Sequence, residues 1–321
     1  MDTGCSSGRG ERGRILFMGT PAFAARILNG LLLEKWNVVG VVTQADKPKG
    51  RGRIIVPPPV RTVAEEANLP VFQPARIKDP ELIETLQGLD PEVIMVAAYG
   101  KILPHEILGL PRLGCFNVHA SLLPAYRGAA PIQWSLIRGE TITGITIFRM
   151  DAGMDTGDIL LTRSIAILPE ETAGELRERL SSQAIPLVSE ALEILLQGKA
   201  VFIPQDSSRA TYAPVLKKEY GRIDWGLAGE EIRNRLRGLD PWPGAYTSWQ
   251  GRLLKLFCGR AETLEPDLVP GQVAEASSRG LLVRTGVGVL RIEEVQIEGG
   301  RRMKVGEFLR GHRMKEGEQL G

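Results

Sequence analysis

The sequence predicts an α/β protein in which a doubly wound, mostly parallel sheet is followed by a small C-terminal β-barrel of the OB type. Short apolar stretches alternate with helical patterns through the first part of the chain, as in doubly wound folds. Residues 93–98 are apolar throughout, which is typical of a parallel strand covered on both faces. After Gly198 the pattern changes to short strands separated by glycines, which favours a small barrel.

The first domain is expected to span residues 14–198. Its strands are expected at residues 14–18, 37–43, 71–72, 93–98, 116–119 and 144–149. Its helices are expected at residues 23–33, 61–67, 79–86 and 173–197, where apolar residues recur at helical spacing. Thr20 is expected to cap the first helix, which Pro21 can begin, and Pro80 occupies the first turn of the third.

A linker at residues 199–212 is expected to lead into a second domain at residues 213–321. A helix at residues 230–237 precedes strands expected at residues 244–247, 253–257, 271–274, 281–284 and 289–297. Residues 1–13 are expected to form a disordered tail, because Gly, Ser and Arg dominate there and no apolar core marks a secretory signal. Whether this tail belongs to the natural start is left open.

Composition sets the broad class. The 321 residues suggest two domains, and 43% hydrophobic with 24% charged residues is ordinary for a soluble globular protein. No apolar run reaches the ~20 residues that a membrane span needs. The three cysteines are far apart and odd in number, so neither a disulfide framework nor a zinc knuckle is indicated. A reducing cytoplasm is therefore the expected location.

The strand at residues 116–119 carries the strongest chemical signal. Side chains alternate between the two faces of a strand, so Asn117 and His119 point the same way while Phe116 and Val118 enter the core. An amide and an imidazole then stand together at the end of a buried strand. This arrangement places an oxyanion donor beside a titratable base.

A glycine-hinged loop at residues 150–158 supplies carboxylates to the same region. An Asn, a His and an Asp brought together at strand ends suggest acyl or formyl transfer to an amine. Asp151, Asp155 and Asp158 do not fall at the first, third and fifth positions of an EF-hand calcium loop. A solvated Asp/Gly turn explains the loop alone as well as a functional role does.

Other enzyme classes fit less well. The turn after the first strand, Gly19-Thr20-Pro21, lacks the G-x-G-x-x-G pattern of a nicotinamide enzyme. Ser121 can be imagined as a hydrolase nucleophile, but no G-x-S-x-G elbow surrounds it. His105 and His312 have no cluster of metal ligands around them, so no metal is expected.

Basic residues gather in two places although the net charge is only +2. The first group lies in a loop that is long for a doubly wound fold: Lys47, Lys49, Arg51 and Arg53. The second lies near the C-terminus and includes Arg301, Arg302 and Lys304. Both groups are suited to contact phosphates, which favours a polyanionic partner.

These motifs together resemble the methionyl-tRNA formyltransferase family, from about residue 15 to the C-terminus. The matching segments are Phe17-Met18-Gly19-Thr20-Pro21, Gly50-Arg51-Gly52, Ala97-Ala98-Tyr99-Gly100, Asn117-Val118-His119, Ser121-Leu122-Leu123-Pro124, Arg127-Gly128-Ala129-Ala130-Pro131-Ile132, Met154-Asp155-Thr156-Gly157-Asp158, Ile223-Asp224-Trp225 and Asp240-Pro241-Trp242-Pro243. The Asn-x-His pair, the Ser-Leu-Leu-Pro segment and the later Asp are also shared by formyltransferases that act on glycinamide ribonucleotide or amino sugars, and by formyltetrahydrofolate hydrolases.

The resemblance implies a formyltransferase-like variant of the Rossmann fold. It implies 10-formyltetrahydrofolate as the formyl donor and the α-amino group of methionyl-tRNA, the initiator of translation, as the acceptor. The family's catalytic residues fall on Asn117, His119 and Asp155, and its inserted loop places a tRNA-contacting arginine at Arg51. The family's folate-contacting segment falls on Ser121, Leu122, Leu123 and Pro124, and we expect Tyr99 and Gly100 to line the same pocket.

Three rival functions remain open at this stage: an amino-sugar formyltransferase, a formyltetrahydrofolate hydrolase, and a non-catalytic RNA-binding protein. The two basic groups favour a nucleic-acid substrate over the first two, and the intact Asn117, His119 and Asp155 argue against the third. No dimer motif is apparent, so a monomer is expected. The sequence leaves open how initiator and elongator tRNA are told apart, and whether His119 or Asp155 takes the amine proton.

Overall fold

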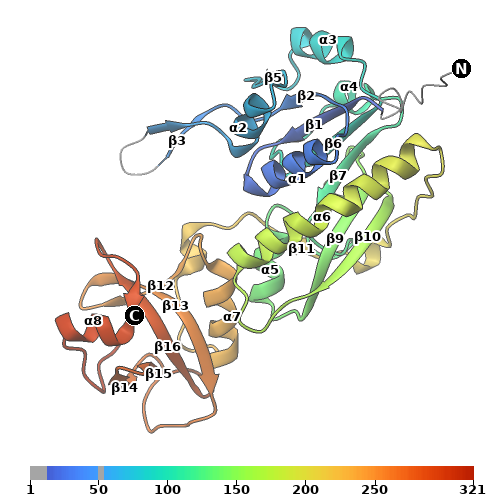
Figure 1. Cartoon of the computed structure of the whole chain (residues 1–321). Coiled ribbons are helices and arrows are strands. Elements are labelled where there is room, and N and C mark those ends of the chain that lie inside the picture. The colour runs from blue at the N-terminus through green and yellow to red at the C-terminus, as the bar shows by residue number, and fades with distance from the viewer. Residues whose placement is uncertain (1–12, 50–53) are drawn as a thin grey trace, which may run out of the picture. The chain divides into compact units, whose positions relative to one another are not determined.

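The computed structural model describes residues 13–49 and 54–321. Contacts between Cα atoms divide the chain into two units (Figure 1). Unit 1 comprises Met1–Gly128, Gly144–Ile165 and Glu178–Tyr212, and unit 2 comprises Ala129–Thr143, Ala166–Arg177 and Ala213–Gly321. This division differs from a continuous domain at residues 14–198, because two segments of that range group with the C-terminal part.

Unit 1 is built on a mostly parallel sheet of seven strands in the order β10-β9-β7-β6-β1-β2-β5. The strands are β1 (Ile15–Gly19), β2 (Val38–Val42), β5 (Val71–Phe72), β6 (Val93–Ala97), β7 (Cys115–His119), β9 (Ile142–Arg149) and β10 (Ile159–Ala166). β1 pairs in parallel with β2 and β6, and β6 pairs in parallel with β7, whereas β9 runs antiparallel to β7. The predicted doubly wound, mostly parallel fold is therefore confirmed.

Helices lie alongside this sheet (Figure 1). They are α1 (Ala22–Leu33), α2 (Pro59–Glu66), α3 (Pro80–Gly88), α4 (His105–Leu108) and α6 (Ala173–Leu196), the last of which extends across the boundary between the units. Asp79 caps α3, with its carboxylate accepting from Glu81 N. One face of the sheet packs into a core with α3 and α4, in which Leu16, Ile94 and Leu86 are fully buried.

Two local predictions are wrong. Thr20 does not cap α1, because its hydroxyl donates instead to the Tyr99 carbonyl oxygen at 3.2 Å, and Pro21 precedes the helix without a side-chain cap. The expected long loop after β2 contains a two-stranded sheet formed by β3 (Lys47–Lys49) and β4 (Ile54–Val56). The hairpin shape follows from the antiparallel register that pairs Lys47 with Val56.

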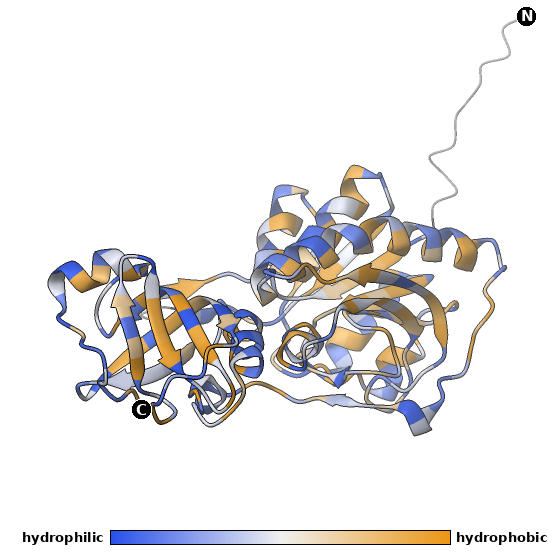
Figure 2. Cartoon of the chain, turned by 90° about the horizontal axis from the view of Figure 1, so that it is seen from below, coloured by the Kyte–Doolittle hydropathy of each residue, from blue (hydrophilic) through white to orange (hydrophobic). Residues whose placement is uncertain are grey.

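Unit 2 contains an antiparallel sheet in the order β12-β13-β16-β15-β14, with β17 paired to β16. Its strands are β12 (Ala245–Trp249), β13 (Arg252–Glu262), β14 (Val273–Ser277), β15 (Gly280–Arg284), β16 (Val289–Ile297) and β17 (Met303–Lys304). Hydrophobic and hydrophilic residues alternate along several strands of this sheet in Figure 2, as expected of a sheet with one buried face. The C-terminal β domain is confirmed, while closure into an OB-type barrel stays a prediction.

Three helices belong to this unit: α5 (Pro131–Ile137), α7 (Gly229–Leu239) and α8 (Val305–Gly311). The buried side chains of α7 and α8, among them Leu236 and Phe308, join the core formed by the strands. Of these helices only α7 was expected from the sequence. Within residues 13–49 and 54–321, no helix has both the length and the apolar character needed to cross a membrane.

Candidate active site

The strand β7 holds Asn117 and His119 in the middle of the unit 1 sheet. It pairs with β6 on one side and β9 on the other, so that Asn117 lies opposite Phe148 and His119 opposite Thr146. The two polar residues are separated by one position and share a face of the strand. His119 is 6% exposed, and its ring meets the Phe148 ring edge-on with centroids 6.4 Å apart.

His119 lies between a backbone carbonyl and a carboxylate. Its Nε2 is 2.9 Å from the Tyr126 carbonyl oxygen, and its Nδ1 is 3.7 Å from Asp155 Oδ2. A carbonyl oxygen can only accept a hydrogen bond, so Nε2 must carry a proton. This leaves Nδ1, on the side of Asp155, as the nitrogen able to exchange a proton. At 3.7 Å, Nδ1 and Oδ2 are close but lie beyond hydrogen-bonding distance of each other.

Asp155 is turned inward from its loop. Only 14% of its side chain is exposed, and its Oδ2 accepts a hydrogen bond from Gly128 N at 2.7 Å. Asp151 serves the loop itself, since its Oδ1 accepts from Gly153 N at 2.9 Å and Thr156 Oγ1 at 2.7 Å. The loop is therefore more than a solvated turn: one carboxylate shapes it and another faces His119.

Gly157 allows this loop to approach β9 closely. A Cβ built on Gly157 would overlap the Arg149 carbonyl oxygen, so no other residue fits there without a shift of the backbone. Arg149 N donates to Asp158 O at 2.9 Å and ties the end of the loop to the same strand.

The Ser-Leu-Leu-Pro segment follows β7 and is held by Thr146 of β9. The Thr146 hydroxyl donates to Ser121 O at 2.7 Å and accepts from Leu123 N at 3.1 Å. The Ser121 hydroxyl is itself fully buried and donates to Ala125 O at 2.6 Å. A nucleophile must be exposed and paired with a base, so this geometry disfavours Ser121 as the nucleophile of a hydrolase.

Tyr99 and Gly100 follow β6 at the same edge of the sheet. Burial raises the pKa of the Tyr99 phenol to about 12, and its ring belongs to the core. The Tyr99 carbonyl oxygen accepts from Gln44 Nε2 at 2.7 Å. Gly100 adopts φ +78°, a left-handed conformation that glycine tolerates best. The Tyr99 ring therefore packs in the core, while its carbonyl oxygen holds Gln44 and Thr20 at this edge.

The predicted tRNA-contacting residues have different surroundings. In the hairpin, Lys47 donates to Gln44 Oε1 at 2.6 Å, while Arg51 and Arg53 lie outside the described residues and Lys49 lies at the end of β3. In the C-terminal group, Arg301 is 77% exposed and pairs with Glu307.

Arg302 and Lys304 are part of an ion-pair network in unit 2. Arg302 pairs with Asp240 at 2.9 Å and with Glu294 at 2.6 Å, and its guanidinium lies 4.1 Å from the centroid of the Phe257 ring. Lys304 pairs with the other oxygen of Glu294 at 2.9 Å. Both cations are thus paired with carboxylates of unit 2, and their contact with tRNA stays a prediction.

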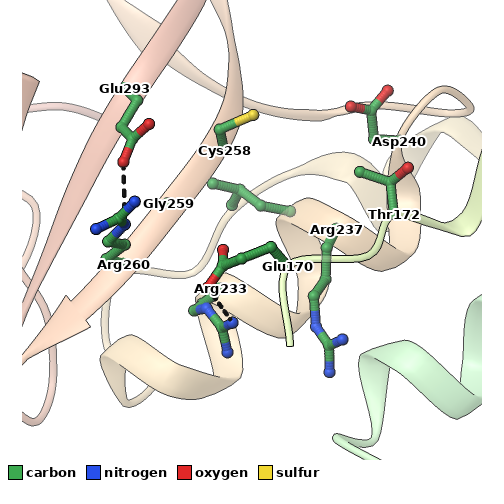
Figure 3. Close-up of a pocket in the computed structure, with 10 residues that line it drawn as sticks. Glu170, Thr172, Arg233, Arg237, Asp240, Cys258, Gly259, Arg260 and Glu293 are labelled. Atoms are coloured by element: carbon green, nitrogen blue, oxygen red, sulfur yellow. Dashed lines mark hydrogen bonds and ion pairs between the residues drawn. The ribbon is translucent and has the colours of Figure 1, made fainter. Parts of the chain in front are cut away.

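A cavity of about 230 Å³ lies within unit 2 (Figure 3). Arg233 and Arg260 on its wall are paired with Glu170 and Glu293. Burial lowers the pKa of the neighbouring Arg237. None of the predicted catalytic residues lines this cavity. In the part of the chain that the structure describes, no group of three or more His, Cys, Asp or Glu side chains is arranged to hold a metal ion.

Gln205, to which the sequence analysis gave no role, contacts the Asp155 loop, and Arg127 in turn holds Gln205. Gln205 donates to the Asp155 carbonyl oxygen at 2.9 Å, and Arg127 donates to Gln205 Oε1 at 2.8 Å. Gln205 falls in the segment predicted to be a linker. Arg127 falls within a motif of the resemblance, which was the only signal in the sequence for either residue.

Comparison with known proteins gives consistent matches. The family model of formyl transferase matches residues 13–192, and that of the formyl transferase C-terminal domain matches residues 215–313. The methionyl-tRNA formyltransferase of Desulforamulus reducens is 50% identical over 313 residues, covering 96% of this chain and 98% of the relative. That of Geobacter sulfurreducens is 47% identical over 308 residues, covering 96% of each chain.

Solved structures share the fold at low identity. HypX from Aquifex aeolicus in complex with tetrahydrofolic acid aligns with a TM-score of 0.64 at 19% identity, covering 97% of this chain and 51% of that chain. The N-formyltransferase from Helicobacter canadensis, in complex with folinic acid and dTDP-3-aminofucose, aligns with a TM-score of 0.64 at 15% identity. It covers 90% of this chain and 99% of that chain.

Proposed function

Because the chain belongs to the methionyl-tRNA formyltransferase family, we propose that Asn117, His119 and Asp155 transfer a formyl group to the α-amino group of methionyl-tRNA. The donor in this proposal is 10-formyltetrahydrofolate and the acceptor is the initiator tRNA. The observation that carries the proposal is the approach of His119 Nδ1 to Asp155 Oδ2 at 3.7 Å, beside Asn117 on the same strand face.

Formyl transfer requires a base for the amine proton and a hydrogen-bond donor for the charge on the formyl oxygen. The amine must lose a proton as its nitrogen bonds to the formyl carbon, and the formyl oxygen carries negative charge until the bond from that carbon to the folate nitrogen breaks. The Asn117 amide suits the second task, because no hydrogen bond holds it among the side chains that the structure describes. Losing one such donor costs roughly 2.7–4 kcal/mol in other enzymes.

The His119–Asp155 pair suits the first task. Nε2 is held by the Tyr126 carbonyl oxygen, so Nδ1 is the ring nitrogen that can accept a proton from the amine. Asp155 then faces the nitrogen that becomes positive and stabilises it, while the hydrogen bond from Gly128 N keeps the carboxylate in place. The proton can return through the same nitrogen to the folate leaving group.

The donor is proposed to bind where β6 and β7 end. These strands pair in parallel, so their carboxyl ends meet at one edge of the sheet, which is the usual ligand position in such folds. Ser121, Leu122, Leu123 and Pro124 would line one side of the pterin and Tyr99 with Gly100 the other. A structure with folate bound over unit 2 instead would contradict this placement.

The tRNA is proposed to contact the β3–β4 hairpin, through Lys47, Lys49, Arg51 and Arg53, and the C-terminal group of Arg301, Arg302 and Lys304. Arg301 is the most exposed of the latter three side chains and is the strongest candidate among them. We assign catalysis to residues 14–198 and, apart from the hairpin, tRNA binding to residues 213–321. The protein is proposed to be a cytoplasmic monomer.

One assay separates this function from its rivals. Purified protein is incubated with 10-formyltetrahydrofolate alone, with uncharged tRNA, with methionyl-tRNA and with an amino-sugar nucleotide, and release of tetrahydrofolate is followed. We expect turnover only with methionyl-tRNA. Release without an acceptor would indicate a hydrolase, release with the sugar a sugar formyltransferase, and tRNA binding without release a non-catalytic protein.

A further inference from the structure

We propose that Gln205, oriented by the buried Arg127, is a positioning residue that holds the Asp155 carboxylate against His119. This inference rests on the proposed function, because it assigns Gln205 its role through a catalytic Asp155. Neither residue contacts His119 directly among the described side chains. Their effect is to fix the loop that carries Asp155.

Every hydrogen-bonding position of the Gln205 side chain is used. Its Nε2 donates to Asp155 O at 2.9 Å and to Gly157 O at 2.8 Å, which accounts for both amide hydrogens. Its Oε1 accepts from Arg127 Nε at 3.1 Å and Nη2 at 2.8 Å, which accounts for both lone pairs. The carboxamide therefore has a single orientation, in which it donates hydrogen bonds to two carbonyl oxygens of the loop.

Arg127 is buried to an unusual degree for its type. It is 3% exposed, and its side-chain partners are neutral: Gln205 Oε1 and, at 3.4 Å, Ser207 Oγ. In the described part of the chain no carboxylate pairs with it. A buried guanidinium is costly unless its N–H groups have acceptors. Arg127 therefore needs the Gln205 side-chain oxygen to stay in place, and this keeps the Gln205 carboxamide fixed.

The next residue along the chain completes the arrangement. Gly128 N donates to Asp155 Oδ2 at 2.7 Å, so the segment 127–128 holds Asp155 twice: through the carboxylate directly, and through the backbone by way of Gln205. Asp155 has φ +55°, an uncommon left-handed conformation that Asp tolerates better than most non-glycine residues. Without Gln205, the loop backbone would be free to leave this conformation and to turn the carboxylate away from His119 Nδ1.

The four hydrogen bonds of Gln205, to Arg127 and to the two loop carbonyls, require a carboxamide on a side chain of this length. Gln205→Met keeps the volume of the side chain and removes all four hydrogen bonds. Gln205→Glu keeps the acceptor for Arg127 but directs a carboxylate oxygen at the carbonyls of Asp155 and Gly157. Both variants should release the loop, and Gln205→Glu should do so while retaining the contact with Arg127.

The test is a double-mutant cycle between Gln205 and Asp155 in the full-length protein. Formyl transfer to methionyl-tRNA is measured in single turnover, with enzyme in excess, for the parent, Gln205→Met, Asp155→Asn and the double variant. We expect Gln205→Met to lower the transfer rate by about 10²-fold, as for a displacement of about 1 Å in a catalytic group, without weakening binding of donor or tRNA. In the Asp155→Asn background the same change should have no further effect, because its influence passes through the Asp155 carboxylate.

A control variant tests for general effects of replacing a glutamine, and a second Gln205 variant is available in case the first unfolds. Gln87→Ala alters an exposed glutamine on α3, a helix that carries none of the proposed catalytic, folate or tRNA residues, and should leave the rate unchanged. If Gln205→Met unfolds, Gln205→Glu provides the same comparison. A parental rate in either folded Gln205 variant, or equal effects in both backgrounds, would overturn the positioning role. If Asp155→Asn itself keeps the parental rate, the proposed function fails as well, so the two failures are distinguishable.

Discussion

Replacing Thr146 by Val tests how the donor loop is held. The Thr146 hydroxyl is fully buried and bonds Ser121 O at 2.7 Å and Leu123 N at 3.1 Å. Valine has nearly the same shape but leaves both backbone groups without a partner. A buried polar group left unpaired costs about 1–3 kcal/mol, so two of them should cost about 2–6 kcal/mol before the loop relaxes. Relaxation would lower this cost by moving Ser121 and Leu123, at the expense of the donor site.

The matched control is Thr146→Ser, which keeps the hydroxyl and loses one buried methyl at a cost of about 0.5–1.5 kcal/mol. Urea unfolding gives the free energy of unfolding for both variants, and steady-state kinetics give KM for 10-formyltetrahydrofolate. We expect Thr146→Val to be less stable than Thr146→Ser and to have the higher KM for the donor. Equal stability and equal KM in the two variants would refute the idea that these two hydrogen bonds organise the loop.

Three further predictions concern charge and protonation. Arg51→Ala should weaken tRNA binding and make its salt dependence shallower, because each phosphate contact lowers the log of the affinity by about 0.7–0.9 for each log unit of salt concentration. Affinities measured at several salt concentrations would be the same for variant and parent if Arg51 is not a contact. Burial raises the pKa of the Cys115 thiol to about 12, so iodoacetamide at pH 8 should label exposed Cys258 before Cys115, and faster labelling of Cys115 would contradict its burial. The Lys304 hydrogen bond lowers the pKa of Glu294 from its ordinary 4.5, so the stability that Glu294 contributes is present above that value and lost as pH falls below it. Glu294→Gln should therefore lower Tm at pH 7 and have little effect at pH 3, and an equal drop at both values would exclude this linkage.

The face of β7 that carries Asn117 and His119 was predictable because the alternation of apolar and polar residues lies within one strand. Phe116 and Val118 are apolar and buried, and the alternation places Asn117 and His119 on the other face. The sequence also indicated that the glycine-hinged loop at residues 150–158 would bring a carboxylate to these two side chains, and Asp155 does face His119. Local patterns of this kind survive folding because the strand period depends only on backbone geometry.

Features that depend on distant partners could not be predicted in this way. Gln205 is 50 residues from Asp155 and 78 from Arg127 in the chain, and nothing in its own neighbourhood marks it. Thr20 matched the pattern of a helix cap, but its hydroxyl bonds Tyr99 O, which lies 79 residues away. In both cases a tertiary hydrogen bond decides the role of a polar side chain, and local sequence contains no trace of it.

The central claim is that His119 and Asp155 act together in formyl transfer. The most direct measurement is the amount of formylmethionyl-tRNA formed by His119→Ala and Asp155→Ala, with folate binding measured on the same samples. The account predicts that each variant loses at least ~10²-fold in turnover while donor binding largely survives, as for a lost acid–base group. His105→Ala, which alters an exposed histidine of α4, should match the parent. Near-parental turnover in His119→Ala or Asp155→Ala would contradict the assignment.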